Sequence, residues 1–180
     1  MANKRTYELA FVGLKQGIHE FEYALDKEFF SERGASDLPT MCAQVKLTLD
    51  KHVGFMMLKF EVSGQTEGHC DRCGNLLQLE LWDDFNMVVK LVEHPEQMND
   101  QEEDPDVYYI SRTESHLNME PWLYEFVMLS IPLQQVCPTD DSGKSTCNPE
   151  VLEKLEKMRH EQQKASANSI WKGLDKFKEN

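Results

Sequence analysis

The chain has 180 residues, of which 40% are hydrophobic, so it is long enough to bury the core of one domain. Its formal net charge is −13, with 19 Lys and Arg against 32 Asp and Glu. This balance disfavours nonspecific binding to nucleic acid, which depends on basic side chains that neutralise phosphates. The sequence has no apolar run of the roughly 18 residues that a membrane span needs, and it does not start with a secretory signal. We therefore expect a cytoplasmic protein with no membrane contact.

Alternating apolar residues predict strands at the beginning of the chain. Residues 7–12 and 19–25 alternate and are separated by a turn that contains glycine, so we expect these two strands to pair. Asp26 is a suitable N-cap, and Gly34 is a suitable helix end. A short helical turn is therefore predicted between them.

The clearest hairpin pattern follows at residues 45–49 and 55–62, where apolar and polar residues alternate on both sides of a polar turn. Cys42 lies in the same alternating stretch and is interpreted as a small buried core residue. Residues 64–74 then interrupt the sheet with a turn that contains the first pair of cysteines.

Beyond that turn, residues 77–82 and 85–92 alternate again and predict two strands joined at a pair of aspartates. The composition then becomes acidic and rich in turn-forming residues, which predicts a loop or mobile insertion at about 93–106. A short strand is expected at residues 107–110.

Helical spacing of apolar residues predicts a helix that begins after Asn118, with Pro121 in its first turn. Its apolar stripe, which we expect to pack on the sheet, is formed by Met119, Trp122, Leu123, Phe126 and Leu129. A ligand-binding aromatic box is the alternative for two of these residues, Trp122 and Phe126. Pro132 is expected to end the helix.

A second helix is predicted from Asn148-Pro149-Glu150, which combines a cap, a proline and an acidic residue in the first turn. The remaining residues, 161–180, are interpreted as a polar linker followed by a docking segment. The apolar residues of the docking segment are Trp171, Leu174 and Phe177. It can dock either onto its own domain or onto a partner.

These patterns together predict an α+β fold. We expect a mainly antiparallel sheet with one packed helix, a staple of four cysteines that resembles a zinc knuckle, and a C-terminal helical segment. A single domain is expected over residues 1–160, with the acidic loop at about 93–106 inside it.

The cysteine spacing predicts a metal site. Cys70 and Cys73 are separated by two residues and followed by Gly74, whose backbone can curl so that amides face the sulfurs. Cys137 and Cys147 are separated by nine residues, a wider spacing than in common zinc ribbons, with a loop flexible enough to close. We expect these four thiols to hold one structural zinc ion, which leaves no open position for catalysis. Unpaired thiols in the second loop are the alternative.

A thiol redox or metal-dependent enzyme that uses Cys70 and Cys73 is the alternative function. Redox motifs of this spacing usually follow a strand and open a helix, where the helix N-terminus lowers the pKa of the first thiol. Here strands are predicted on both sides, and no other catalytic motif appears in the sequence. The sequence therefore favours a protein that is not an enzyme.

Several motifs have a known counterpart. They are Gly68-His-Cys-Asp-Arg-Cys-Gly-Asn-Leu-Leu, Asp104-Pro-Asp-Val-Tyr-Tyr-Ile, Glu125-Phe-Val-Met-Leu-Ser-Ile-Pro-Leu followed by Cys137 and Cys147, and the C-terminal Trp171-Lys-Gly-Leu. Over about residues 40–177 the chain resembles the YceD-like family of large ribosomal RNA accumulation proteins. The resemblance implies a role without known catalysis in ribosome biogenesis, in the accumulation of large-subunit ribosomal RNA. The zinc prediction rests on the four thiols and not on the resemblance.

The acidic charge predicts what kind of partner such a protein would bind. A basic ribosomal protein or an assembly factor of the large subunit fits a chain of charge −13 better than ribosomal RNA does, although direct contact with the RNA stays an alternative. Within the acidic segment, we expect Glu102, Glu103 and Asp104 to form the partner-binding site.

Overall fold

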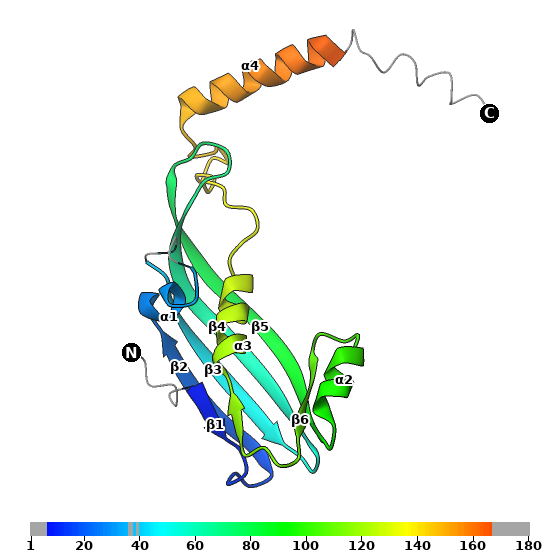
Figure 1. The fold of residues 1–180 in the computed structure, drawn as a ribbon. Helices are drawn as coiled ribbons and strands as arrows, with labels where there is room; N and C mark the ends of the chain where they lie inside the picture. Colours follow the sequence, from blue (N-terminus) through cyan, green and yellow to red (C-terminus); the bar gives the residue numbers. More distant parts are fainter. Residues whose placement is uncertain (1–6, 36–37, 39, 167–180) are drawn as a thin grey trace, which may run out of the picture. The chain divides into compact units, whose positions relative to one another are not determined.

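The computed structural model describes residues 7–35, 38 and 40–166 (Figure 1). The elements in chain order are β1 (Glu8–Ala10), β2 (Gly17–Leu25), α1 (Lys27–Ser31), β3 (Cys42–Lys51), β4 (Phe55–His69), β5 (Leu76–Val92), α2 (Pro95–Gln101), β6 (Val107–Ser111), β7 (His116–Asn118), α3 (Glu120–Leu129) and α4 (Pro149–Ser166). The α+β class and the largely antiparallel pairing are confirmed. The predicted docking segment with Trp171, Leu174 and Phe177 lies outside the described residues.

The described chain divides into two compact units. Unit 1 contains residues 7–35, 38, 40–68 and 78–133, and unit 2 contains residues 69–77 and 134–166. None of the described helices is long and apolar enough to span a bilayer.

Unit 1 is built on a sheet of five strands in the order β2-β3-β4-β5-β6. The strands β2, β3 and β4 pair antiparallel, with Leu47 opposite both Phe21 and Phe60, whereas β6 pairs parallel with β5. The predicted pairing of the first two strands is wrong. Instead, β1 pairs antiparallel with β7, opposite Leu117, because a segment distant in sequence supplies its partner.

The core lies on one face of this sheet. Its central residues from β3 and β4 are Ala43, Val45, Leu47, Leu49, Met56, Leu58, Phe60 and Val62. Because side chains alternate along a strand, Cys42 points to the opposite face from Ala43 and is exposed. The prediction that Cys42 is buried is therefore wrong, because the buried positions of this strand begin at Ala43, one residue later.

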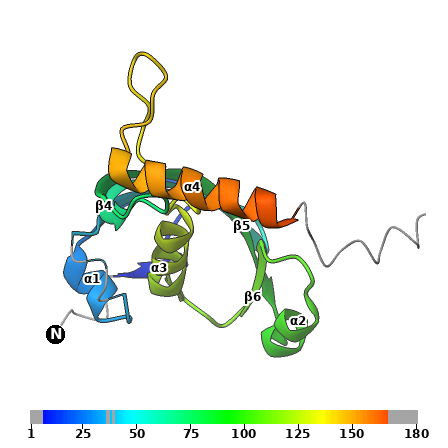
Figure 2. The ribbon, with the colours of Figure 1, turned by 90° about the horizontal axis from the view of Figure 1, so that it is seen from above.

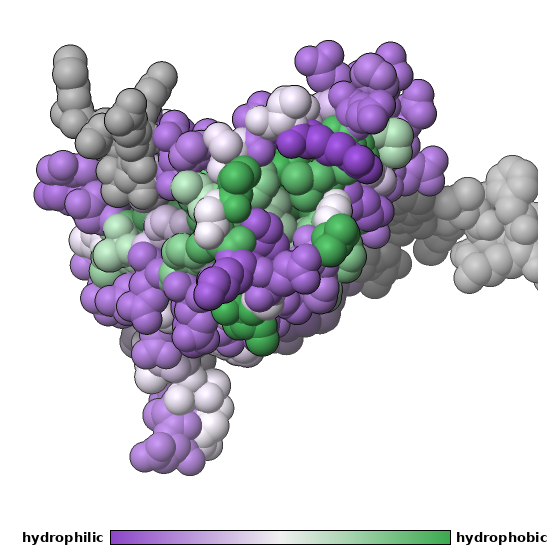
Figure 3. Space-filling view, turned by 90° about the horizontal axis from the view of Figure 1, so that it is seen from below, coloured by the Kyte–Doolittle hydropathy of each residue, from purple (hydrophilic) through white to green (hydrophobic). Residues whose placement is uncertain are grey.

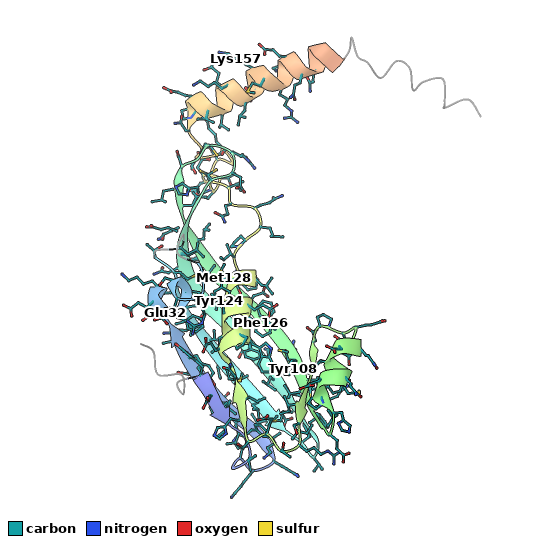
Figure 4. All side chains as sticks on the ribbon, viewed as in Figure 1. Glu32, Tyr108, Tyr124, Phe126, Met128 and Lys157 are labelled. Carbon is teal, nitrogen blue, oxygen red and sulfur yellow. The ribbon has the colours of Figure 1, made fainter. Side chains whose placement is uncertain are left out.

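The helices α1 and α3 lie on the same side of the sheet (Figure 2). Phe126 of α3 contacts Phe60 of β4 at a ring distance of 4.9 Å and stacks on Phe85 of β5 at 4.5 Å. Figure 4 labels Phe126 on α3, in front of the sheet. The prediction that α3 packs on the sheet is confirmed. Asn118 accepts a hydrogen bond from the Glu120 amide, and Met119 occupies the cap position itself.

Asp26 caps α1, as predicted, because its carboxylate accepts hydrogen bonds from the amides of Glu28 and Phe29 at 3.0 Å. Arg33, just beyond the helix, forms an ion pair with Glu120 at 2.6 Å. These contacts tie α1 to the beginning of α3.

Two strands are longer than the sequence predicted. The strand β4 continues to His69, so that only residues 70–75 interrupt the sheet. The strand β5 is continuous from Leu76 to Val92, although Trp82, Asp83 and Asp84 are exposed in succession. The strand therefore passes through the two aspartates without a turn, and its alternation of buried and exposed side chains shifts at this point.

The acidic segment at 93–106 is not only a loop, because it contains the helix α2. Asn99 of this helix donates to the carbonyl of Tyr109 at 2.9 Å and accepts from its amide at 2.8 Å. The carboxamide therefore takes the place of a neighbouring strand at this point of β6. Such capping protects an edge strand from pairing with another chain.

On the face seen from below, a group of apolar side chains is surrounded by hydrophilic ones (Figure 3). Several exposed apolar residues occur at or beside turns of unit 1, and they are Val12, Ile18 and Val53. Isolated apolar residues of this kind are normal on a protein surface.

Unit 2 contains four of the five cysteines and the helix α4. The predicted start of α4 is confirmed, since Asn148 accepts a hydrogen bond from the Glu150 amide at 3.0 Å. A surface ion pair of 2.6 Å joins Glu153 and Lys157 on successive turns. The beginning of the expected polar linker is helical, since α4 extends to Ser166.

Candidate metal centre

The first half of the site is the tight turn between β4 and β5. The amide of Gly74 donates to the carbonyl of Cys70, and the amide of Cys70 donates to the carbonyl of Asn75, both at 2.8 Å. Gly74 has a φ of 72°, in the region that favours glycine. The curl that the sequence predicted after Cys73 is therefore present.

The second half is a small hairpin between Cys137 and Cys147. A β-bridge joins Thr139 and Ser145, and the Thr146 amide donates to the carbonyl of Pro138 at 3.1 Å. At its tip, Asp140 accepts hydrogen bonds from the amides of Ser142 and Lys144, at 3.0 and 2.8 Å. The hairpin brings together two thiols that are separated by nine residues, and it explains why their spacing is wide.

Hydrogen bonds from backbone amides connect the two halves. The Asp71 amide donates to the carbonyl of Gln135 at 2.6 Å, and the Gln135 amide donates to the Asp71 carboxylate at 2.7 Å. The Cys137 amide points at the sulfur of Cys70, 3.4 Å away. The four thiols are thus brought together within unit 2 by protein contacts.

The sulfurs of the four cysteines all lie within 4.8 Å of one another. The Cys70 and Cys147 sulfurs are 3.7 Å apart, and the Cys73 and Cys137 sulfurs are 3.6 Å apart. Four sulfurs placed about 2.3 Å from a central zinc in a tetrahedron would be separated by roughly 3.8 Å. A disulfide needs about 2.05 Å, so the spacing matches a tetrahedral metal site and not a pair of disulfides.

The cluster has its own apolar surroundings. Cys70, Cys137 and Cys147 are 3, 6 and 4% exposed, and Cys73 is half-buried. Leu77 and Leu152 pack against them, from the beginning of β5 and from α4. A metal ion at this position would be shielded from water.

The thiols differ in acidity. Burial raises the pKa of Cys70, but the amides of Arg72, Cys137 and Cys73 outweigh it and lower that pKa to about 6. Hydrogen bonds from the backbone of Asn148 and Asn75 lower the pKa of Cys73.

Cys137 behaves in the opposite way. Burial and the neighbouring sulfurs raise its pKa to about 12, since a further negative charge beside thiolates is unfavourable. A bound cation would remove that repulsion. The cluster therefore combines donors that stabilise thiolates with a charge imbalance that a metal ion would correct.

The arrangement can hold a metal ion with four protein ligands. Such a site has no open position for a water molecule or a substrate, which is the usual difference between structural and catalytic zinc. The cluster is thus suited to stabilising the fold around it.

The acidic residues Glu102, Glu103 and Asp104 lie between α2 and β6, in unit 1. The Glu102 carboxylate accepts a hydrogen bond of 2.6 Å from the hydroxyl of Tyr109 and two more from the amides of Glu103 and Asp104. The Tyr109 hydroxyl is the main cause that lowers the pKa of Glu102. Asp104 caps the amide of Asp106. Two of the three acidic residues therefore hold their own segment together.

The four-cysteine cluster and the α+β fold define a protein with a candidate structural metal site. The chain belongs to the large ribosomal RNA subunit accumulation protein YceD family, whose model matches residues 58–178. The matched range includes all four cysteines. Comparisons with curated proteins and with solved structures gave no match.

Membership of this family implies a role in large-subunit ribosomal RNA accumulation. The family is not a known enzyme family. Its name connects the chain to the large ribosomal subunit, without a named binding partner.

One surface feature had no counterpart in the sequence prediction. A pocket forms beside Tyr108 and Trp122. Of these two residues, the sequence singled out only Trp122, as a candidate for an aromatic box. Of the two candidates for an aromatic box, Phe126 is a core residue, whereas half-buried Trp122 lines this pocket. The pocket was missed because its residues come from segments that are separated in the sequence.

Proposed function

We propose that this protein is a non-catalytic factor of ribosome biogenesis that supports accumulation of large-subunit ribosomal RNA through contacts with another protein. The observation that carries the proposal is the family match over residues 58–178. The closed geometry of the four thiols supports a factor without catalysis, because such a site offers no position for a substrate. The proposed site of action is the cytoplasm.

The metal in this proposal is a structural zinc bound by Cys70, Cys73, Cys137 and Cys147. Sulfur separations of 3.6 and 3.7 Å, close to a tetrahedral edge, support it. Zinc is favoured over harder cations because thiolates are soft ligands. When bound, the ion would supply a link between two segments of unit 2, and the backbone donors around Cys70 would stabilise its thiolate.

The partner in this proposal is a basic ribosomal protein or an assembly factor of the large subunit. The net charge of −13 supports it, because complementary charge steers association and like charge suppresses it. The acidic segment with Glu102, Glu103 and Asp104 is the proposed contact.

The partner is best tested with Glu103→Lys, because Glu103 is exposed, whereas Glu102 and Asp104 accept bonds within their segment. We expect capture of a basic large-subunit protein to weaken with rising salt, and to weaken further by about tenfold in this variant. Glu125→Lys, which makes the same charge change at an exposed position of α3, is the control. Equal capture by both variants and the unchanged protein would exclude Glu103 from the contact.

The function itself is tested by removing the protein from its cells. We expect the amount of large-subunit ribosomal RNA to fall relative to small-subunit ribosomal RNA, and to recover when the unchanged chain is restored. Quantification of both RNAs in total RNA measures this. An unchanged ratio in cells that lack the protein would contradict the proposed function.

A further inference from the structure

A pocket of about 510 Å³ lies in unit 1, between α2, β6, β7 and the beginning of α3. Its size falls within the range of specific binding pockets, roughly 300–1,000 Å³. All of its walls belong to the same compact unit. Figure 4 shows Tyr108 on β6 at this position, near α2.

The chemistry of the walls favours a cation. Glu96 and Glu114 contribute two carboxylates, and the described residues that line the pocket include no Lys or Arg. Tyr108 and Trp122 contribute aromatic rings, and Tyr108 is 41% exposed. An aromatic face attracts Lys and Arg, and a carboxylate forms strong hydrogen bonds with either.

The walls are held in place by contacts among the lining residues and with the core. Trp122 meets the Tyr108 ring edge-on, with centroids 5.4 Å apart, and also contacts Phe60 of the core at 6.5 Å. The two hydrogen bonds between Asn99 and the Tyr109 backbone fix α2 against β6. A pocket with fixed walls loses little entropy when a ligand binds.

We propose that this pocket binds an arginine side chain from the basic protein partner of this chain. The proposal rests on the proposed function, because it assigns to that partner a specific point of contact. Arginine fits better than lysine, since its planar guanidinium can stack on a ring while its edge donates to a carboxylate. Arginine and aromatic residues are also enriched at the energetic centres of protein interfaces.

The test is a titration of the ¹⁵N-labelled full chain with a short peptide that carries two arginines in a glycine and serine background. The matched peptide carries citrulline instead, which keeps the shape of arginine but not its charge. We expect the arginine peptide to shift amide signals of the residues that line the pocket, and the citrulline peptide to bind at least about tenfold more weakly.

Variants locate the binding. Glu96→Gln combined with Glu114→Gln should weaken arginine-peptide binding by about tenfold, and Tyr108→Leu should weaken it by several-fold. Glu80→Gln combined with Glu125→Gln removes the same charge at exposed positions outside the pocket, and should change binding by less than about twofold. Equal losses in both double variants, or equal binding of both peptides, would overturn the proposal. Shifts of the same amide signals by single-stranded RNA alone, without the peptide, would also overturn it, because RNA would then be the occupant.

A cellular measurement separates this proposal from the proposed function. If the Glu96→Gln, Glu114→Gln chain restores large-subunit ribosomal RNA as fully as the unchanged chain, the pocket proposal fails and the proposed function stands. If pocket-specific peptide binding is observed but removal of the protein leaves the RNA ratio unchanged, the proposed function fails and the binding site stands.

Discussion

Cys73 and Cys42 are a matched pair of thiols in different surroundings. Cys73 belongs to the four-sulfur cluster, whereas Cys42 is exposed on β3. We expect Cys73→Ser to lower the free energy of unfolding by at least about 2 kcal/mol, because metal binding contributes to folding, and Cys42→Ser to change it by less than about 0.5 kcal/mol. Thermal and denaturant unfolding of both variants measures this. Equal stability of the two variants would count against a metal at the cluster.

Single residues in the acidic segment show why composition alone is a coarse guide. From composition alone, Glu102, Glu103 and Asp104 are equivalent charges on a predicted loop. Their hydrogen bonds differ, because Glu102 accepts from Tyr109 and two amides while Asp104 accepts from the amide of Asp106. Only Glu103 can be reversed in charge without removing one of these contacts, which makes it the sharper test.

At the scale of elements, the pairing of β3 with β4 depends on one glycine. A Cβ atom added to Gly64 would lie 2.4 Å from the carbonyl oxygen of Cys42 and 2.9 Å from the Cα of Ala43. Because both neighbours are backbone atoms, the strands would have to move apart. We expect Gly64→Ala to destabilise the protein by about 1–3 kcal/mol in denaturant unfolding.

Gly13→Ala is the control for this substitution, since a Cβ there has no described neighbour within 4 Å. It should leave stability unchanged or raise it by up to about 1 kcal/mol. A Gly64→Ala protein as stable as the Gly13→Ala protein would show that the strands separate without cost.

The predictable elements were those that local chemistry determines. Alternation identified the hairpin of β3 and β4, Asp26 identified the start of α1, and Pro149 identified the start of α4. Pairing was less predictable, because β1 has its partner, β7, far away in sequence. The assignment of Cys42 failed because a shift of one residue reverses the face of a strand.

The two candidate sites also differ in how far the sequence could predict them. Cysteine spacing and a following glycine predicted that the four thiols would come together, because cysteines at close spacing in a tight turn have few other structural uses. The pocket beside Tyr108 could not be predicted, since its walls come from four elements and consist of common residue types. Only the fold brings them together.

At the scale of the molecule, the four-cysteine cluster brings the two segments of unit 2 together. The unit consists of two segments, 69–77 and 134–166, and Cys70 and Cys137 are 67 positions apart in sequence. A link that closes a long loop removes much of the conformational freedom of the unfolded chain. A structural metal ion is therefore the expected source of stability for a unit with few buried residues of its own.

Metal content is the measurement that tests this account most directly. Elemental analysis of the purified, tag-free chain should find close to one zinc per chain, and thiol titration of the folded protein should find Cys42 reactive while the four clustered thiols are protected. A zinc content far below one, with all five cysteines reacting freely in the folded protein, would contradict the proposed metal site.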